Sequence, residues 1–208
     1  MDKVDLKKTV VGFRAKSGEF STVEIPDRRY LMIDGHGDPN TSSEFSSAVE
    51  TLYPLAYALK FLSKRELDRD YVVPPLEGLW WAEDMSVFTS ARDKSKWDFT
   101  LMLLVPDWLD AGHVGAATEA VAGKKDVPRL GELRFELLCE GTCIQTLHIG
   151  SFDAEAAVLD HLHHEVIPGA GFELSGTHHE IYLSDFRRVA PEKLRTILRQ
   201  PVQPSAPS

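Results

Sequence analysis

Two parts of the chain repeat the same order of predicted elements, and this repeat limits the folds that the chain can adopt. Residues 30–37 read as an extended run that ends in a glycine turn, a helical pattern follows over 41–62, and two more strand-like runs come after it. Residues 146–162 repeat the strand, the glycine-bearing turn and the helix, again with two strands behind them. Two strand–helix–strand–strand modules are typical of an α+β fold, in which helices pack on an antiparallel sheet.

We therefore predict a single domain over residues 1–208. Module one spans about 22–123, module two about 130–200, and a loosely attached tail covers 201–208. A chain of 208 residues is long enough to bury a sizeable core. Small-molecule sites are common where two modules meet, so we expect a ligand cleft between them.

Local signals predict where several elements begin and end. Thr41 and Glu44 form a capping-box pattern at the start of the first helix. Pro54 should bend that helix or split it in two, because proline has no N–H to donate. Pro106 predicts the start of another helix, which stops near Gly123.

The second half of the chain and its two ends carry further signals. The stretch up to about residue 18 predicts an arm or adapter strand. Residues 133–151 predict a hairpin of two strands, and Pro191, at a first helical position, predicts a final helix. Cys139 and Cys143 fall on the predicted hairpin, where we expect both to be reduced; the alternative is a cross-strand disulfide or a redox pair.

The charge of the chain disfavours some classes of partner. The formal net charge is -9, and an acidic surface repels the phosphate backbone of nucleic acids while it mildly favours cationic ligands. No apolar run is long enough to span a bilayer, and the N-terminal residues lack the apolar region of a signal peptide. We therefore expect a cytoplasmic protein, monomeric or weakly dimeric, that binds neither nucleic acid nor membranes.

No spacing in the sequence indicates a metal or a cofactor. A lone C-x3-C pair lacks the further ligands of a zinc site, and His161 and His164 lack the H-E-x-x-H order of a helical metal site. The glycines in 35–37 match neither the dinucleotide fingerprint nor the phosphate-binding loop. We therefore expect no metal and no cofactor.

Two adjacent tryptophans lie in the stretch "PPLEGLWWAED". If this stretch is extended, successive side chains point to opposite faces, so that Trp81 shares a face with Glu77 and Trp80 faces the other way. The face of Trp80 reads as core, whereas the face of Trp81, with its carboxylates, could be a surface, an interface or a pocket for an aromatic cation. One tryptophan then packs in the core and the other forms a wall of a pocket. Which of the two faces the pocket stays open, because a bulge at Gly78 would shift the alternation by one. Glu77 belongs either to the pocket or to its rim.

The stretch "THHEIYLSD" places three polar or aromatic side chains, His178, Glu180 and Tyr182, on one face of a predicted strand. A solvated sheet face is one reading of this set. The other reading is a cleft in which a carboxylate and a phenol bind a lipophilic cation or act as a general acid or base. Further candidates for ligand contact are aromatic residues for which core packing is the default: Tyr53, Tyr57 and Phe99.

Four ordered segments of the chain resemble the GyrI-like (gyrase-inhibitor-like) small-molecule-binding proteins, and more narrowly their stand-alone subgroup without a DNA-binding domain. The segments are "VEIPDRRYLMIDGHGDPN", "EFSSAVETLYPLAYALKF", "PPLEGLWW" and "HHEIYLSDFRRVAPEKLRTILR". The resemblance covers nearly the whole chain. It implies two strand–helix–strand–strand modules that are related by a pseudo-twofold axis, with a ligand cleft between them.

The resemblance also implies a kind of ligand. Relatives serve as effector-binding domains of multidrug-sensing regulators, which bind bulky, lipophilic and often cationic compounds through aromatic residues and a glutamate. The glutamate is best matched here by Glu180, with Tyr182 beside it. A subfamily of stand-alone members hydrolyses the cyclopropane ring of DNA-alkylating natural products inside a cage of aromatic residues, and "EGLWW" would supply part of such a cage.

Two hypotheses of function follow. In the first, the protein binds lipophilic, often cationic or aromatic small molecules, with Trp80 or Trp81 stacked on the ligand, Glu180 as the charge partner and Tyr182 as a hydrogen-bond donor. In the second, it is a cyclopropanoid cyclopropyl hydrolase in which Glu180 or Tyr182 assists the reaction. The sequence leaves open whether the protein catalyses a reaction or only binds.

Overall fold

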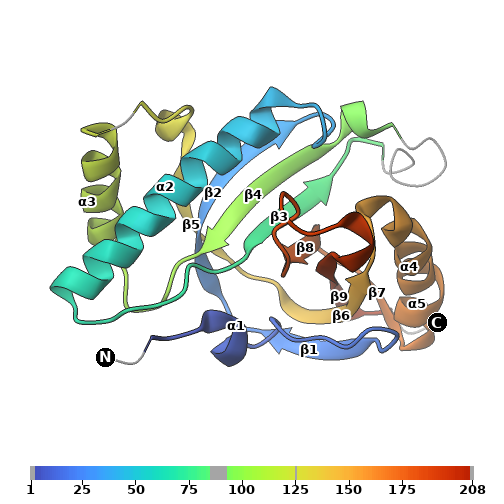
Figure 1. Ribbon diagram of the computed structural model, residues 1–208. Coiled ribbons are helices and arrows are strands. Elements are labelled where there is room, and N and C mark those ends of the chain that lie inside the picture. Colours follow the sequence, from blue (N-terminus) through green and yellow to red (C-terminus); the bar gives the residue numbers. More distant parts are fainter. Residues whose placement is uncertain (1–2, 85–92, 125, 207–208) are drawn as a thin grey trace.

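A computed structural model describes residues 3–84, 93–124 and 126–206 (Figure 1). One curled antiparallel sheet forms its centre, with strand order β1-β6-β9-β8-β3-β4-β2-β5, and β7 pairs with β9 outside this path. The strands are β1 Ser21–Ile25, β2 Arg28–His36, β3 Leu76–Trp81, β4 Asp98–Leu104, β5 Arg134–Leu138, β6 Gly141–Ile149, β7 Phe172–Leu174, β8 His178–Tyr182 and β9 Arg195–Pro204.

The sheet consists of two copies of one pattern that meet between β3 and β8. Module one contributes β2-β4-β3 and module two contributes β6-β9-β8, so that the strand order reads symmetrically from the centre outward. Each module also lends a strand to the other, because β1 pairs with β6 and β5 pairs with β2. The predicted α+β fold with two strand–helix–strand–strand modules is confirmed.

The long helix α2 (Ser43–Glu66) joins β2 to β3 and lies across module one (Figure 1). Its buried face repeats every three or four residues, as an amphipathic helix requires. The cap is Ser42 and not the predicted Thr41, because the Ser42 side chain accepts a hydrogen bond from the N–H of Glu44 at 3.2 Å. Pro54 lies within the helix and does not split it; the carbonyl that its missing N–H leaves unpaired belongs to the exposed Glu50.

The other helices are short. They are α1 Leu6–Thr9, α3 Ala111–Ala122, α4 Glu155–His161 and α5 Ile167–Gly169, with a π-helical turn over Leu162–Val166 between the last two. The prediction that α3 begins at Pro106 is wrong, because Asp110 caps it by accepting a hydrogen bond from the N–H of His113 at 3.1 Å. No helix in the described parts of the chain is both long and apolar enough to cross a membrane.

The final segment is a strand and not the predicted helix. Only Pro191–Lys193 forms a short 3-10 turn, and β9 then runs between β6 and β8. Both faces of this central strand are buried, so it lacks the alternation of a half-exposed strand, and its apolar spacing also fits a helix. β9 continues through Pro204, so the predicted tail begins inside the sheet; residues 207 and 208 of that tail lie outside the described residues.

The predicted hairpin over 133–151 is also wrong, although both of its strands exist. β5 and β6 pair with different neighbours and not with each other, because the link between them crosses from one module to the other and turns Glu140 into the protein interior. Cys139 is exposed and Cys143 is buried, and both are free. Burial raises the pKa of the Cys143 thiol to about 12, so the thiol stays protonated at neutral pH.

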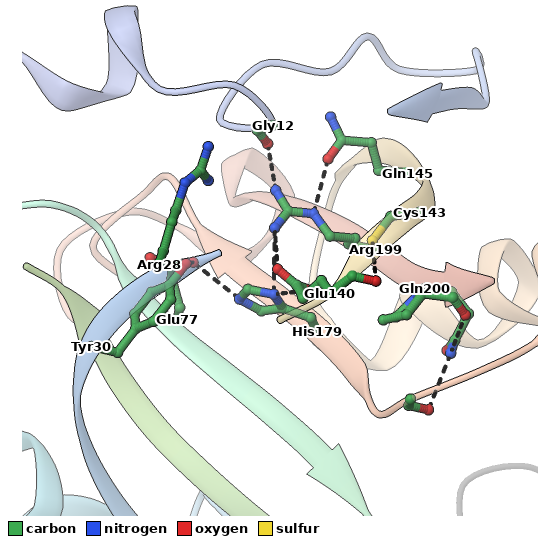
Figure 2. A network of polar contacts seen from close by, with 12 residues as sticks. Gly12, Arg28, Tyr30, Glu77, Glu140, Cys143, Gln145, His179, Arg199 and Gln200 are labelled. Atoms are coloured by element: carbon green, nitrogen blue, oxygen red, sulfur yellow. Dashed lines mark hydrogen bonds and ion pairs between the residues drawn. The ribbon is translucent and has the colours of Figure 1, made fainter. Parts of the chain in front are cut away.

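Glu140 belongs to a buried network of charged side chains that joins the two modules (Figure 2). Arg199 of β9 donates to Glu140 at 2.9 Å, and both side chains are almost fully buried. His179 of β8 places Nδ1 at 2.8 Å from Glu140 and Nε2 at 3.0 Å from Oε2 of Glu77. Arg199 also donates to the carbonyl of Gly12 at 2.8 Å, so the N-terminal arm covers this face of the sheet.

The network predicts a loss of stability in acid. Burial alone raises the pKa of Glu140, but the charges and hydrogen bonds of His179 and Arg199 outweigh it and lower the pKa to about 2. The resulting stabilisation is complete above the ordinary glutamate value and is lost as the pH falls toward the folded value. We expect the unfolding free energy to fall by up to roughly 3 kcal/mol more in the wild type than in Glu140→Gln between neutral pH and about pH 2. Urea unfolding across this range measures it, and parallel curves would contradict it.

Candidate functional site

A cavity of about 110 Å³ lies between the two modules, on the face of the sheet opposite to the buried network. Strand alternation creates this division: Glu77 and His179 point to one face of β3 and β8, while Trp80 and Glu180 point to the other. The cavity is lined by residues of both modules, namely Pro39, Asn40, Phe45, Trp80, Lys94, Trp97, Phe152, Glu155, Ala156, Leu159, His178, Glu180, Tyr182 and Phe186.

Aromatic rings form most of the cavity wall. Trp80 is packed between Phe45, whose ring centroid is 6.3 Å away and nearly parallel, and Trp97, whose ring meets it edge-on at 5.7 Å. On the side of module two, Phe152 meets the ring of Tyr182 edge-on at 5.7 Å. Aromatic faces carry a negative potential, so a cavity with such walls attracts flat apolar groups and cations.

A chain of hydrogen bonds runs along the floor of the cavity. The indole N–H of Trp80 donates to the hydroxyl of Tyr182 at 2.8 Å, and that hydroxyl donates to Oε2 of Glu180 at 2.8 Å. Burial, and then the nearby charge of Glu180, raise the pKa of Tyr182 well above its ordinary value. Tyr182 therefore remains a phenol that donates a hydrogen bond to Glu180, and this bond fixes the orientation of the carboxylate.

Gly78 leaves the space that this chain of hydrogen bonds needs. A Cβ atom on Gly78 would lie 2.8 Å from Nε1 of Trp80 and 3.1 Å from the hydroxyl of Tyr182. We expect Gly78→Ala to displace the indole and to destabilise the protein by about 1–3 kcal/mol, as overpacking does in other cores. Urea unfolding and the near-ultraviolet circular dichroism of tryptophan measure this. Gly131→Ala is the control, because no atom lies within 4 Å of a Cβ built there; equal stability of the two variants would contradict the prediction.

A second carboxyl group, that of Glu155, enters the cavity from α4. Its side chain is buried, and its Oε1 has no hydrogen-bond partner among the described residues. Burial, and then the charge of Glu180, raise the pKa of Glu155 well above its ordinary value. Nε2 of His178 lies 3.5 Å from Oε1 of Glu180, and neither ring nitrogen of His178 makes a hydrogen bond within the described residues. The cavity therefore combines apolar walls with polar atoms that lack partners.

Four residues singled out in the sequence lie together in this cavity: Trp80, His178, Glu180 and Tyr182. The alternation within "THHEIYLSD" places the last three, because β8 is regular and one of its faces lines the cavity. The register of β3 with β8 pairs Trp80 with His178 on the cavity face, so the tryptophan whose face reads as core in the sequence is the one that lines the cavity. Trp81 lies on the opposite face and is only half-buried.

The remaining candidates lie elsewhere. Glu77 is fully buried in the charged network and does not line the cavity, because the alternation that brings Trp80 to the cavity turns Glu77 away. Phe99 lies behind the wall and touches Trp80 at 5.5 Å between ring centroids. Tyr53 lines another cavity, of about 140 Å³, where the guanidinium of Arg187 lies over its ring, and Tyr57 is exposed on α2.

Sequence reasoning missed several residues of the site. The aromatic ones are Phe45, Trp97, Phe152 and Phe186. They come from a helix, from the turn before β4 and from two loops of module two, so that no local pattern groups them. Glu155 lies in the first turn of α4, where an acidic residue normally faces solvent, and nothing in its local sequence distinguishes it.

The fold and the cavity define a class of protein. Two antiparallel modules that enclose an aromatic cavity with a few convergent polar groups form a small-molecule-binding domain. The family model of the GyrI-like small molecule binding domain matches residues 18–203, so the chain belongs to the GyrI-like family. No curated protein sequence matches it.

Solved structures share this fold along almost the whole chain. An uncharacterized conserved protein from Listeria innocua is 36% identical with a TM-score of 0.87, and the alignment covers 97% of this chain and 100% of that one. A hydrolase from Listeria innocua is 34% identical with a TM-score of 0.82 and the same coverage. A structure of the EcmrR–DNA complex is 14% identical with a TM-score of 0.57 over 90% of this chain and 58% of that one, which is a likeness of fold alone.

Proposed function

We propose that the protein binds lipophilic aromatic cations in the cavity between its modules, with Glu180 as the charge partner. The observation that carries this proposal is the position of Glu180, which is held by the hydroxyl of Tyr182 inside a wall of aromatic rings. A carboxylate in such surroundings is poorly hydrated, and a cationic ligand compensates for that loss. The aromatic faces add cation–π attraction, which has little directional demand and suits ligands of varied shape.

In this binding mode, Trp80 and Trp97 flank the flat part of the ligand and Glu180 faces its charge. The net charge of -9 favours the approach of a cation as well. The test is calorimetric titration with naphthylmethylammonium and with the neutral naphthylmethanol, which share one ring system and differ in charge. The proposal requires that naphthylmethylammonium bind more tightly than naphthylmethanol. Equal affinities, or no binding of either compound, would contradict the proposal.

A second candidate function is hydrolysis, and two observations favour it. A structure related at 34% identity over 97% of this chain is described as a hydrolase. In addition, Glu155 and Glu180 share one cavity but have different surroundings, and such pairs commonly divide the roles of acid and base. The substrate class that the sequence resemblance suggests is a cyclopropane conjugated to a dienone in a DNA-alkylating natural product.

In that reaction, a hydrogen bond to the dienone carbonyl from a protonated carboxyl or from Tyr182 draws electrons toward the carbonyl oxygen. Water attacks a ring carbon, the carbon–carbon bond of the cyclopropane breaks, and its electron pair enters the dienone to form a phenol. Glu180 accepts a proton from the water, and the phenol oxygen gains one. Mass spectrometry of such a compound after incubation with the protein decides this candidate: a ring-opened product that contains one added water indicates an enzyme, and unchanged compound indicates binding alone.

A further inference from the structure

The carboxyl group of Glu155 is the cavity group that the proposed binding mode leaves unused. The residue is 4% exposed, yet Oε1 has no hydrogen-bond partner in the described parts of the protein. The nearby side chain of Thr196 favours the charged form of the carboxyl group, but burial outweighs this effect. A buried polar atom without a partner costs free energy, and a ligand that donates a hydrogen bond to it removes that cost.

The charged groups around Glu155 come from three elements. Glu180 faces it from β8, Lys94 from the turn before β4, and Asp153 from the start of the α4 segment. Lys94 is already matched, because its ammonium lies 2.8 Å from Oδ1 of Asp153 and 5.6 Å from the centre of the Trp97 ring. The charge inside the cavity is therefore dominated by Glu180. Burial and this like charge favour the protonated form of Glu155 while the cavity holds no cation.

We propose that the cavity selects cations that carry N–H groups, such as primary ammonium or amidinium ions, and that Glu155 releases its proton when such a cation binds. The inference rests on the proposed function, because it concerns the same cavity. A primary ammonium can donate one N–H to Glu180 and another to Oε1 of Glu155, and its charge offsets the repulsion between the two carboxylates. A quaternary ammonium carries the same charge but has no N–H, so Oε1 stays unpaired. The proton passes from the carboxyl to the buffer, and no bond within the ligand changes.

Three naphthyl compounds separate these effects. Naphthylmethylammonium carries charge and N–H groups, naphthylmethyl-trimethylammonium carries charge alone, and neopentylnaphthalene has the shape of the trimethyl compound without its charge. Each is titrated calorimetrically near neutral pH in two buffers that differ in ionisation enthalpy, so that proton release is counted directly. We expect the primary ammonium to bind about tenfold or more tightly than the trimethyl compound and to release roughly one proton per ligand.

The variant Glu155→Gln keeps the size of the side chain and removes the ionisable carboxyl proton. In that variant we expect no proton release and a smaller preference for the primary ammonium. A thermal melt shows whether the variant folds, and the proton count on the wild-type protein tests the inference independently of it. Equal binding of the two cations without proton release would overturn the inference and leave the proposed function intact. Failure of both cations to bind would overturn both.

Discussion

Replacing Arg199 with methionine is expected to cost about 3–5 kcal/mol of unfolding free energy, the range observed when one partner of a buried ion pair is removed. Arg199 is fully buried and contacts Glu140, Gln145 and the carbonyl of Gly12. Methionine fills much of the same volume but leaves Glu140 with His179 as its only charged partner in the network. Urea unfolding at neutral pH measures the change.

Arg195→Met on the same strand is the matched control. Arg195 is exposed at the start of β9, and we expect its replacement to change stability by no more than about 0.5 kcal/mol. Removing both charges together, as Glu140→Leu with Arg199→Met, should cost less than the sum of the two single changes, because no isolated charge remains buried. Equal stabilities of Arg199→Met and Arg195→Met would contradict the role given to the network.

Glu180→Gln is expected to weaken the binding of naphthylmethylammonium about tenfold to hundredfold and to leave naphthylmethanol nearly unaffected. The amide keeps the shape of the carboxylate and can still accept the hydrogen bond from Tyr182, so the floor of the cavity should keep its arrangement. The charge is lost, and a hydrogen bond to a charged group contributes roughly 1.5–3 kcal/mol. Calorimetric dissociation constants for the two compounds measure the effect.

Glu165→Gln controls for the change in overall charge, because Glu165 is exposed on the π-helical turn beyond α4. It removes the same formal charge from the surface, and affinity for the cation should stay within about twofold of the wild type, since exposed charges are screened by salt. If both variants lost affinity equally, long-range attraction and not the carboxylate in the cavity would account for cation binding.

The fold was predictable to the extent that local periodicity reports it. α2 and β8 carry clear helical and strand periods, and the repeated order of elements led to the two-module architecture. The same reasoning mispredicts β9, because a strand that is buried on both faces does not alternate apolar and polar residues with a period of two. The hairpin prediction is wrong for a different reason. Interactions between the modules set the pairing partners of β5 and β6, and the sequence near residue 140 carries no signal of those interactions.

The candidate site shows the same limit. His178, Glu180 and Tyr182 were found because they lie two residues apart on one strand. Glu155 lies far from that strand in the sequence, and the packing of α4 brings it to the cavity. Phe186 lies after the regular part of β8, and the path of that loop brings it to the cavity. The sequence suggests Glu77 as a pocket residue because it neighbours the tryptophans. In the structure its carboxylate is buried against His179, and no sequence pattern indicates that pair.

The exchange of edge strands between the modules has a consequence for how the chain acquires its structure. β1 pairs with β6 more than a hundred positions later, and β9, which follows the other strands of the sheet in the chain, occupies the middle of module two. Neither half can complete its hydrogen-bonded ladder alone. We therefore expect slow, all-or-none folding, in which the sheet forms only after β9 has left the ribosome. Fragments cut at the boundary between the halves should stay unstructured when separate and recover the native sheet when mixed.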